Sequence, residues 1–98
     1  MKPLRLKYSR TARRHLRGIA RYTEETWGEA QRDAYVDSLF AGCEAIRKAP
    51  LKGRDRDDLK PGMRSVRIEK HVVYYIPGSG MVWIAAILHE RMDPARHL

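Results

Sequence analysis

The sequence predicts an α+β fold in which a hairpin of two helices packs on one face of a small, mainly antiparallel sheet. Two long segments with helical spacing of apolar residues come first, and three strand-like segments separated by short turns follow. With a further short strand at the start, the expected order is strand, helix, helix, strand, strand, strand. A chain of 98 residues has room for a single domain, which we expect to span residues 1–98.

The first strand and the first helix follow directly on one another. Residues 4–8 alternate apolar and polar side chains, which is typical of a half-buried strand. Ser9 is the expected N-cap of a helix that runs to Trp27, and Gly28 ends it. One face of this helix is apolar, and arginines occupy much of the rest. Gly18 lies in its interior, where glycine lowers helix stability, and indicates a close approach by another backbone.

The second helix is expected over residues 29–48, because the residue before Pro50 disfavours helical backbone. Only Gly28 separates the two helices, so they must pack as an antiparallel hairpin. The apolar stripe of this helix consists of Val36, Leu39, Phe40, Cys43 and Ile46.

Residues 49–62 are rich in turn-forming residues and predict a loop. Strands are expected over residues 63–69, 71–76 and 81–89, and they form a meander because the turns between them are short. The tail is expected to end in one helical turn capped by Asp93.

The last two strands do not alternate in the way a sheet with one covered face does. Both are apolar on both faces, and the two helices can cover only one face. We therefore expect the second face to be covered by a partner. The alternative is that the loop 49–62 and the C-terminal tail fold over it. The side chains that a partner would shelter are Val73, Tyr75, Trp83 and Ile87.

The net charge of +8 is unevenly distributed, since residues 1–23 hold eight basic side chains and no acidic one. This asymmetry favours an anionic partner, either a nucleic acid or an acidic protein segment. For the arginines of residues 10–21, we favour a solvated helix face, partly neutralised by acidic side chains across the hairpin. In the loop, Lys52, Arg54 and Arg56 alternate with aspartates, which indicates a mixed-charge turn rather than a phosphate cradle.

Other classes of protein are excluded by simple features. Because Cys43 is the single cysteine, no disulfide can form within the chain, which argues against a small secreted protein. No apolar run has the length of a signal peptide or of a membrane span, which argues against a membrane protein. We expect a cytoplasmic protein that makes no membrane contact. The histidines lack paired ligand spacing, so we expect no metal and no cofactor.

Four segments, in this order, resemble the ParE branch of the ParE/RelE toxins of bacterial type II toxin–antitoxin systems. They are Tyr8-Ser9-x-x-Ala12, the Trp27-Gly28 break, RDDLKPGMRS at residues 56–65 and LHERMDP at residues 88–94. The resemblance covers almost the whole chain and implies the same α+β fold.

The resemblance implies a toxin that is neutralised in a hetero-oligomer with a ParD-like antitoxin, through which alone operator DNA is bound. It also implies growth arrest by poisoning of DNA gyrase, held on cleaved DNA. The residues expected to bind the antitoxin are Arg13, Leu16, Arg17, Ile19, Tyr22, Tyr35, Tyr74 and Trp83. Those expected to bind the target are Arg64, Arg67, His89 and Arg91.

The alternative is a ribosome-dependent messenger RNA endoribonuclease of the RelE type. Such an enzyme needs a base, an acid and cations around the phosphate. Its working groups would be His89, Arg64 and Arg91. No tyrosine follows Tyr75, so the late catalytic phenol of that branch is missing, and a non-catalytic gyrase inhibitor is the favoured interpretation. His89 could instead hold the tail, and Arg64 could instead bond to loop carbonyls.

Overall fold

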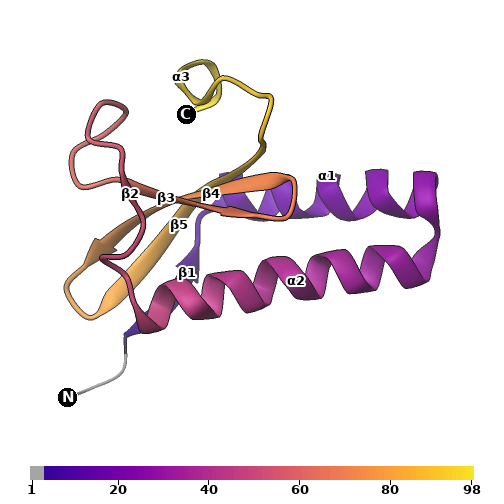
Figure 1. Cartoon of the computed structure of the whole chain (residues 1–98), viewed down its shortest axis with the longest axis horizontal. Helices are drawn as coiled ribbons and strands as arrows, with labels where there is room; N and C mark the ends of the chain where they lie inside the picture. The colour runs from indigo at the N-terminus through magenta and orange to yellow at the C-terminus, as the bar shows by residue number, and fades with distance from the viewer. Residues whose placement is uncertain (1–3) are drawn as a thin grey trace.

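The computed structural model describes residues 4–98. Residues 1–3 lie outside the described residues. They are the first part of the N-terminal segment in which we expected no signal peptide. The elements, in order, are β1 (Arg5–Tyr8), α1 (Arg10–Trp27), α2 (Glu29–Lys48), β2 (Arg54–Asp55), β3 (Arg64–Ile68), β4 (His71–Gly78), β5 (Met81–His89) and α3 (Pro94–His97). The predicted α+β class is confirmed, with the helix hairpin forming one layer and the sheet the other (Figure 1).

The helix hairpin forms as predicted. The Ser9 hydroxyl accepts a hydrogen bond from the Ala12 amide at 2.9 Å, which caps α1. Gly28 ends α1 with its amide bonded to the Glu24 carbonyl, in a backbone conformation (φ 92°) that favours glycine. The two helices run side by side and extend beyond the sheet at the end where they join (Figure 1).

The sheet has five strands in the order β1-β5-β4-β3-β2. β1 pairs with β5 in parallel, and the other neighbours are antiparallel. The two-residue β2 was not predicted. Arg54 and Asp55 are both polar, and a segment of this length is too short to show the alternation of a strand. Between Tyr74 and Tyr75 the register with β5 shifts and skips Ala85.

The first hydrophobic core lies between the helices and the sheet. The Ser9 hydroxyl donates to the Ala85 carbonyl at 2.8 Å, and the Ser9 amide donates to the Ile84 carbonyl at 2.9 Å. These bonds tie the start of α1 to the irregular part of β5. The buried residues of this core are Ala12, Cys43, Ile46, Val73, Tyr75, Val82, Ile84 and Ile87.

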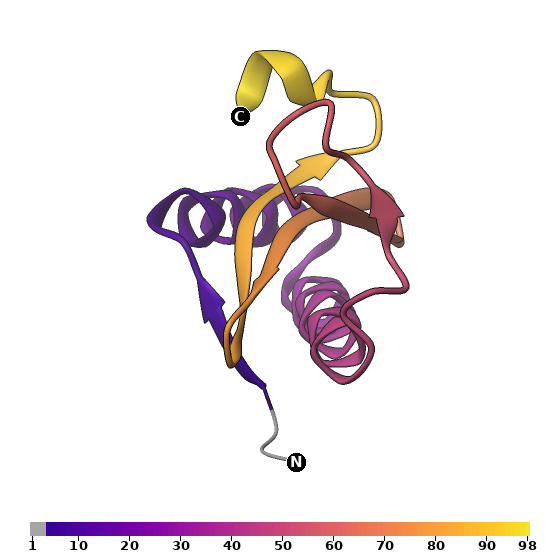
Figure 2. The same ribbon diagram turned by 90° about the vertical axis from the view of Figure 1, so that its left-hand side faces the viewer.

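The second face of the sheet is covered by the chain itself, and the expectation of a partner-covered face is wrong there. Met63, Tyr74, Ala86 and Leu88 form a second buried cluster. Leu59 of the loop and Leu98 of the tail pack against it, and Figure 2 shows the loop and α3 on the side of the sheet away from the helices. Single apolar residues within a polar loop are enough to close this small face.

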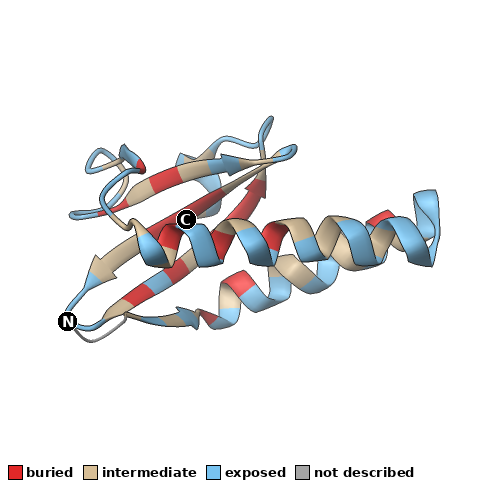
Figure 3. Ribbon diagram, turned by 60° about the horizontal axis from the view of Figure 1, so that its bottom comes forward, coloured by how far each residue is buried: buried red, intermediate tan, exposed pale blue. Residues whose placement is uncertain are grey.

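Three of the four side chains that were expected to need a partner's cover are buried by the chain itself. Val73, Tyr75 and Ile87 are buried under the helices. Trp83 alternates with the helix-facing Val82 and Ile84, and its side chain stays 38% exposed. Figure 3 shows that the helices are buried mainly where they overlie the sheet, and that their joined end is mostly exposed. Neither long helix is apolar enough to cross a membrane.

Candidate partner-docking site

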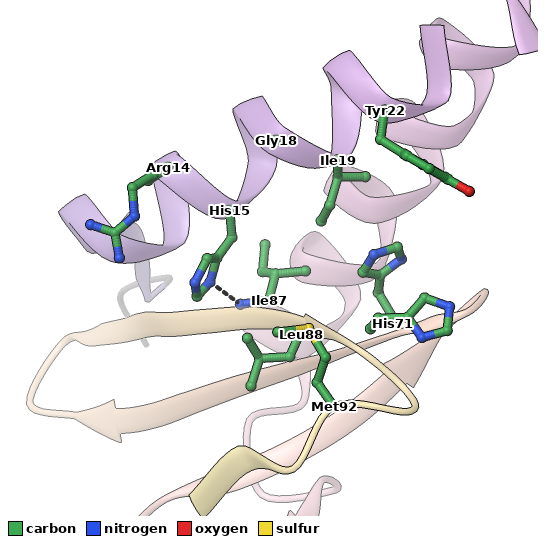
Figure 4. A pocket seen from close by; sticks show the side chains of 10 residues that line it. Arg14, His15, Gly18, Ile19, Tyr22, His71, Ile87, Leu88 and Met92 are labelled. Atoms are coloured by element: carbon green, nitrogen blue, oxygen red, sulfur yellow. Dashed lines mark hydrogen bonds between the residues drawn. The ribbon is translucent and has the colours of Figure 1, made fainter. Parts of the chain in front are cut away.

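An apolar groove of about 350 Å³ lies between α1 and the end of β5 (Figure 4). Ile19 and Tyr22 line it from the helix, and Ile87 and Leu88 line it from the strand. Tyr22 is 66% exposed, which is unusual for a large aromatic side chain beside an apolar groove. The remaining lining residues are Arg14, His15, Gly18, His71, His89 and Met92.

Gly18 forms part of the helical wall of this groove. A Cβ atom built at this position would meet no other atom within 4 Å. The close approach that we expected at Gly18 is therefore not made by any described segment of the chain. A glycine in a helix interior costs about 0.5–1 kcal/mol relative to alanine, and nothing within residues 4–98 offsets that cost. The space over Gly18 is open to another molecule.

Three side chains from different elements meet at one end of the groove. The Tyr35 hydroxyl of α2 lies 2.6 Å from Nδ1 of His71, and it accepts a hydrogen bond from the Lys70 amide at 3.2 Å. The His71 ring packs edge-on against the His89 ring, with centroids 5.4 Å apart. Because the Tyr35 oxygen already accepts from Lys70, we assign its proton to the bond with Nδ1 of His71.

The histidines of the groove stay uncharged where they are buried. Burial, with a smaller contribution from His89, lowers the pKa of His71 to about 4, although Glu90 opposes the shift. Burial also lowers the pKa of His15, whose Nδ1 accepts a hydrogen bond from the Ile87 amide at 3.2 Å. Burial raises the pKa of Tyr35, so this hydroxyl keeps its proton at neutral pH. Burial thus favours the uncharged forms of His15 and His71 within a largely apolar lining.

Helix α1 places one arginine, Arg14, in the lining of the groove, and it carries further arginines on its exposed surface away from the groove. Arg13, Arg14 and Arg17 are exposed, and no carboxylate of residues 4–98 forms an ion pair with them. Arg21 pairs with Glu25 within α1. The expected partial neutralisation is therefore met only at Arg21, and within its own helix, because the carboxylates of Glu24 and Asp33 pair with Arg32 of α2.

The structure brings together only part of the predicted antitoxin-binding set. Arg13, Arg17 and Tyr22 are exposed along α1, where Leu16 and Ile19 are half-buried. Tyr35 lies at the histidine end of the groove. Tyr74 is 4% exposed in the second core, and Trp83 faces the side of the sheet away from the helices.

Several lining residues were missed by sequence reasoning. The signal for His71 was its place at the start of β4, which the antiparallel pairing with β5 puts opposite His89 at the end of that strand. Leu88 and Met92 were considered only as members of the LHERMDP segment, and Ile87 only as an apolar side chain of the last strand that a partner would shelter. No periodicity could have shown that the end of β5 lies beside α1, because that contact depends on strand order.

The residues predicted to bind the target lie in two places. Arg64 donates to the Leu51 and Gly53 carbonyls at 3.1 and 2.9 Å, so it holds the loop after α2. Arg67 pairs with Glu90 at 2.7 Å. His89 accepts a hydrogen bond from the Arg91 amide at 3.2 Å, the backbone bond that was considered as its structural role.

The groups proposed for the nuclease alternative do not come together. Arg64 lies opposite Tyr75 and His89 lies opposite His71, so the two are separated by four residues along β4, or roughly 13 Å. Cys43 is fully buried, and burial raises the pKa of its thiol. Within residues 4–98, no three potential ligand side chains gather to hold a metal ion.

A helix hairpin on a five-stranded mixed sheet, with an open apolar groove beside α1, defines a small two-layer α+β protein. A family model described as the ParE toxin of the type II toxin–antitoxin system parDE matches residues 6–94. The chain belongs to this family of toxins.

Relatives with known names support the same membership. Toxin ParE of Escherichia coli is 40% identical over 79 residues, which are 80% of this chain and 77% of that protein. Toxin ParE1 of Caulobacter vibrioides is 38% identical over 98 residues, covering 100% of this chain and 99% of the relative. A solved chain of a chromosomal ParDE toxin–antitoxin system from P. aeruginosa has the same fold, with a TM-score of 0.77 at 18% identity. That match covers 89% of this chain and 96% of the solved one.

Proposed function

We propose that this protein is the toxin of a type II toxin–antitoxin module, that a ParD-like antitoxin neutralises it in a hetero-oligomer, and that its target in the cytoplasm is DNA gyrase. Membership of the ParE toxin family supports the module. The similarity to a chain of a ParDE system supports an antitoxin partner. Operator DNA is bound through the antitoxin.

The open groove beside Gly18 is the observation that carries the antitoxin site. Its lining is mostly apolar, and Arg14 adds a positive charge from α1, whose exposed surface also carries Arg13 and Arg17. A peptide segment that inserts apolar side chains and carries acidic residues at its flanks is complementary to both features. Tyr22 and Ile19 are the anchors on the toxin side, and the missing side chain of Gly18 lets the partner backbone approach α1.

The gyrase proposal needs no reacting group in the toxin. A protein that binds one state of its target more tightly than the others shifts the population toward that state. Binding to the cleaved gyrase–DNA complex would therefore prevent religation. Arg67, His89 and Arg91 lie at the same end of the sheet and are proposed as target contacts. Arg64 is proposed to act by holding the loop after α2.

The test is to incubate the purified protein with gyrase and supercoiled plasmid and to measure supercoiling and cleaved DNA. The proposal expects cleaved complexes to accumulate with increasing toxin, and the antitoxin to suppress them. If a correctly folded toxin in several-fold excess over gyrase leaves supercoiling and DNA cleavage unchanged, that result counts against gyrase as the target. Cuts in translated messages under the same conditions would instead favour the RelE-type activity.

A further inference from the structure

A second groove, of about 410 Å³, lies on the sheet face opposite the helix hairpin. The loop before β3 forms one wall, and the tail after β5 forms the other with Met92 and Pro94. Its polar lining consists of Arg54, Arg56, Ser65, Arg67, Tyr74 and Glu90.

The strand register explains how these side chains share one face. Arg54 of β2 pairs with Ser65 of β3, and Ser65 pairs with Tyr74 of β4. Residues directly opposite one another in a sheet point to the same face, so these three form one row across the sheet. Arg67 follows Ser65 by two residues, and the period of two places it on that face as well.

The pleat of β2 also separates the charges of the loop. Asp55 and Asp57 lie on the other side of the chain from Arg54 and Arg56, and they line a separate pocket with Arg64. The Asp55 carboxylate accepts from the Asp57 amide at 2.8 Å, and the Asp57 carboxylate accepts from the Gly62 amide at 2.6 Å. Arg56 pairs with Asp58 of the same loop, as expected for a mixed-charge turn, whereas Asp55 and Asp57 line the other pocket.

The cations of the groove keep capacity for a ligand. Arg56 binds Asp58 through two bonds of 3.1 Å, and its guanidinium lies 5.8 Å from the centre of the Tyr74 ring. Arg67 pairs with Glu90. Arg54 has no ion pair within residues 4–98 and is exposed. Three guanidinium groups therefore line the groove. Among its lining residues, Glu90 is the one that carries a carboxylate.

Two hydroxyls complete the site. Ser65 and Tyr74 are 7% and 4% exposed, and the Tyr74 hydroxyl lies beside the Arg56 guanidinium. Both residues line the groove, so their hydroxyls can add polar contacts to those of the arginines. They can donate to an anion that the arginines attract.

We propose that this groove binds phosphate groups of a nucleic-acid strand directly, without gyrase or the antitoxin. A nucleic-acid strand presents a series of singly charged phosphodiesters, each of which can take a bidentate arginine or several single hydrogen bonds. The arginines of the groove come from β2, from the loop after it and from β3, so their separate guanidinium groups suit the repeated charges of a nucleic-acid backbone. The contact carries no sequence information, because it reaches no base edges.

The test is fluorescence anisotropy of the full chain with a labelled 12-nucleotide single-stranded DNA and a 12-base-pair duplex, over a series of salt concentrations. The Arg54→Ala/Arg67→Ala variant should bind the single strand at least tenfold more weakly. Removing two phosphate contacts should also reduce the slope of log K against log salt by about 1.4. Tyr74→Phe keeps the buried ring and the net charge, and it should lose several-fold in affinity without a change of slope.

The matched control is Arg13→Ala/Arg17→Ala, which removes the same charge from α1 and should weaken binding less than threefold. Circular dichroism establishes that each variant is folded. Equal losses for the two arginine pairs, together with wild-type affinity for Tyr74→Phe, would overturn the proposal and assign the binding to overall charge. Competition by a polyglutamate 12-mer as effective as by unlabelled DNA would overturn the choice of phosphate.

Discussion

Gly53 and Gly18 show how the same residue type serves two different purposes in this chain. At Gly53 a Cβ would lie 2.9 Å from Cζ of Tyr75, whose ring is fully buried. The Tyr75 hydroxyl also donates to the Pro50 carbonyl at 2.7 Å and accepts from the Gly53 amide at 3.2 Å. At Gly18 the space is open, so its lack of a side chain serves nothing inside the described protein.

Gly53→Ala should therefore destabilise the protein by about 1–3 kcal/mol, because the ring cannot move away without breaking its hydrogen bonds. Gly18→Ala is the matched control and should stabilise it by about 0.5–1 kcal/mol through helix propensity. Urea denaturation of both variants measures these differences. Equal stability of Gly53→Ala and the wild type would contradict the packing described around Tyr75.

His71 makes the stability depend on pH. Its pKa is about 4 in the folded protein, chiefly because of burial, and about 6.5 when the chain is unfolded. Between these values the unfolded chain takes up a proton that the folded protein refuses, so the free energy of unfolding decreases as the pH falls from 6.5 to 4. Since His71 remains partly exposed, screening by solvent limits the expected loss to about 1–2 kcal/mol.

The measurement is urea denaturation at pH 7 and pH 4.5 for the wild type and for His71→Gln, which keeps an acceptor for Tyr35. The variant should lose less stability than the wild type over this interval by about 1–2 kcal/mol. Carboxylates and His15 titrate in both proteins and cancel in the comparison. Parallel pH dependence of the two would show that the folded protein accepts the proton on His71.

Among the elements, those with a strong period were predictable and those defined by tertiary contacts were not. The ends of α1 and α2 follow from Ser9, Gly28 and Pro50, residues whose backbone preferences act locally. β2 and the skipped Ala85 depend on pairing with another strand, which leaves no local signal. The cover of the second face rests on isolated residues such as Leu59, so no pattern in the loop announced it.

The loop before β3 and the C-terminal tail contribute to the second core, and a substitution at Met63 tests this contribution. Met63 is 1% exposed in the second core, so Met63→Ala should cost about 2–4 kcal/mol in the free energy of unfolding. Leu51→Ala, at a position before β2 that is 70% exposed, is the control and should change stability by less than about 0.5 kcal/mol. Similar, small effects of both would mean that the second face is not closed by this segment.

For the whole molecule, the uneven charge has a kinetic consequence. The exposed Arg13 and Arg17 form no ion pair within residues 4–98 and lie on the same helix as the groove-lining Arg14, so an acidic antitoxin should be steered toward α1. Arg13→Ala/Arg17→Ala should slow association with the antitoxin by about 3- to 10-fold at low salt and leave dissociation nearly unchanged. Stopped-flow mixing at two ionic strengths measures both rates. An effect confined to dissociation would place these arginines inside the interface.

The candidate site was predictable only in part. The charge of α1 and the cost of Gly18 were visible in the sequence, and both indicate a partner. The opposite wall, with Ile87, Leu88 and His71, comes from strands whose order the sequence does not encode locally. Tyr74 was misplaced because an apolar strand residue looks the same whether a partner or the chain's own loop covers it.

The affinity of Gly18→Leu for the antitoxin tests most directly whether the groove is the docking site. Leucine favours helix more than glycine does, and its side chain would occupy the open space beside Ile19 and Tyr22. The variant should be at least as stable as the wild type and yet bind the co-expressed antitoxin at least tenfold more weakly in calorimetry. Ala41→Leu, which adds a leucine at an exposed position of α2, should bind as the wild type does. Undiminished affinity of a folded Gly18→Leu variant would contradict the account.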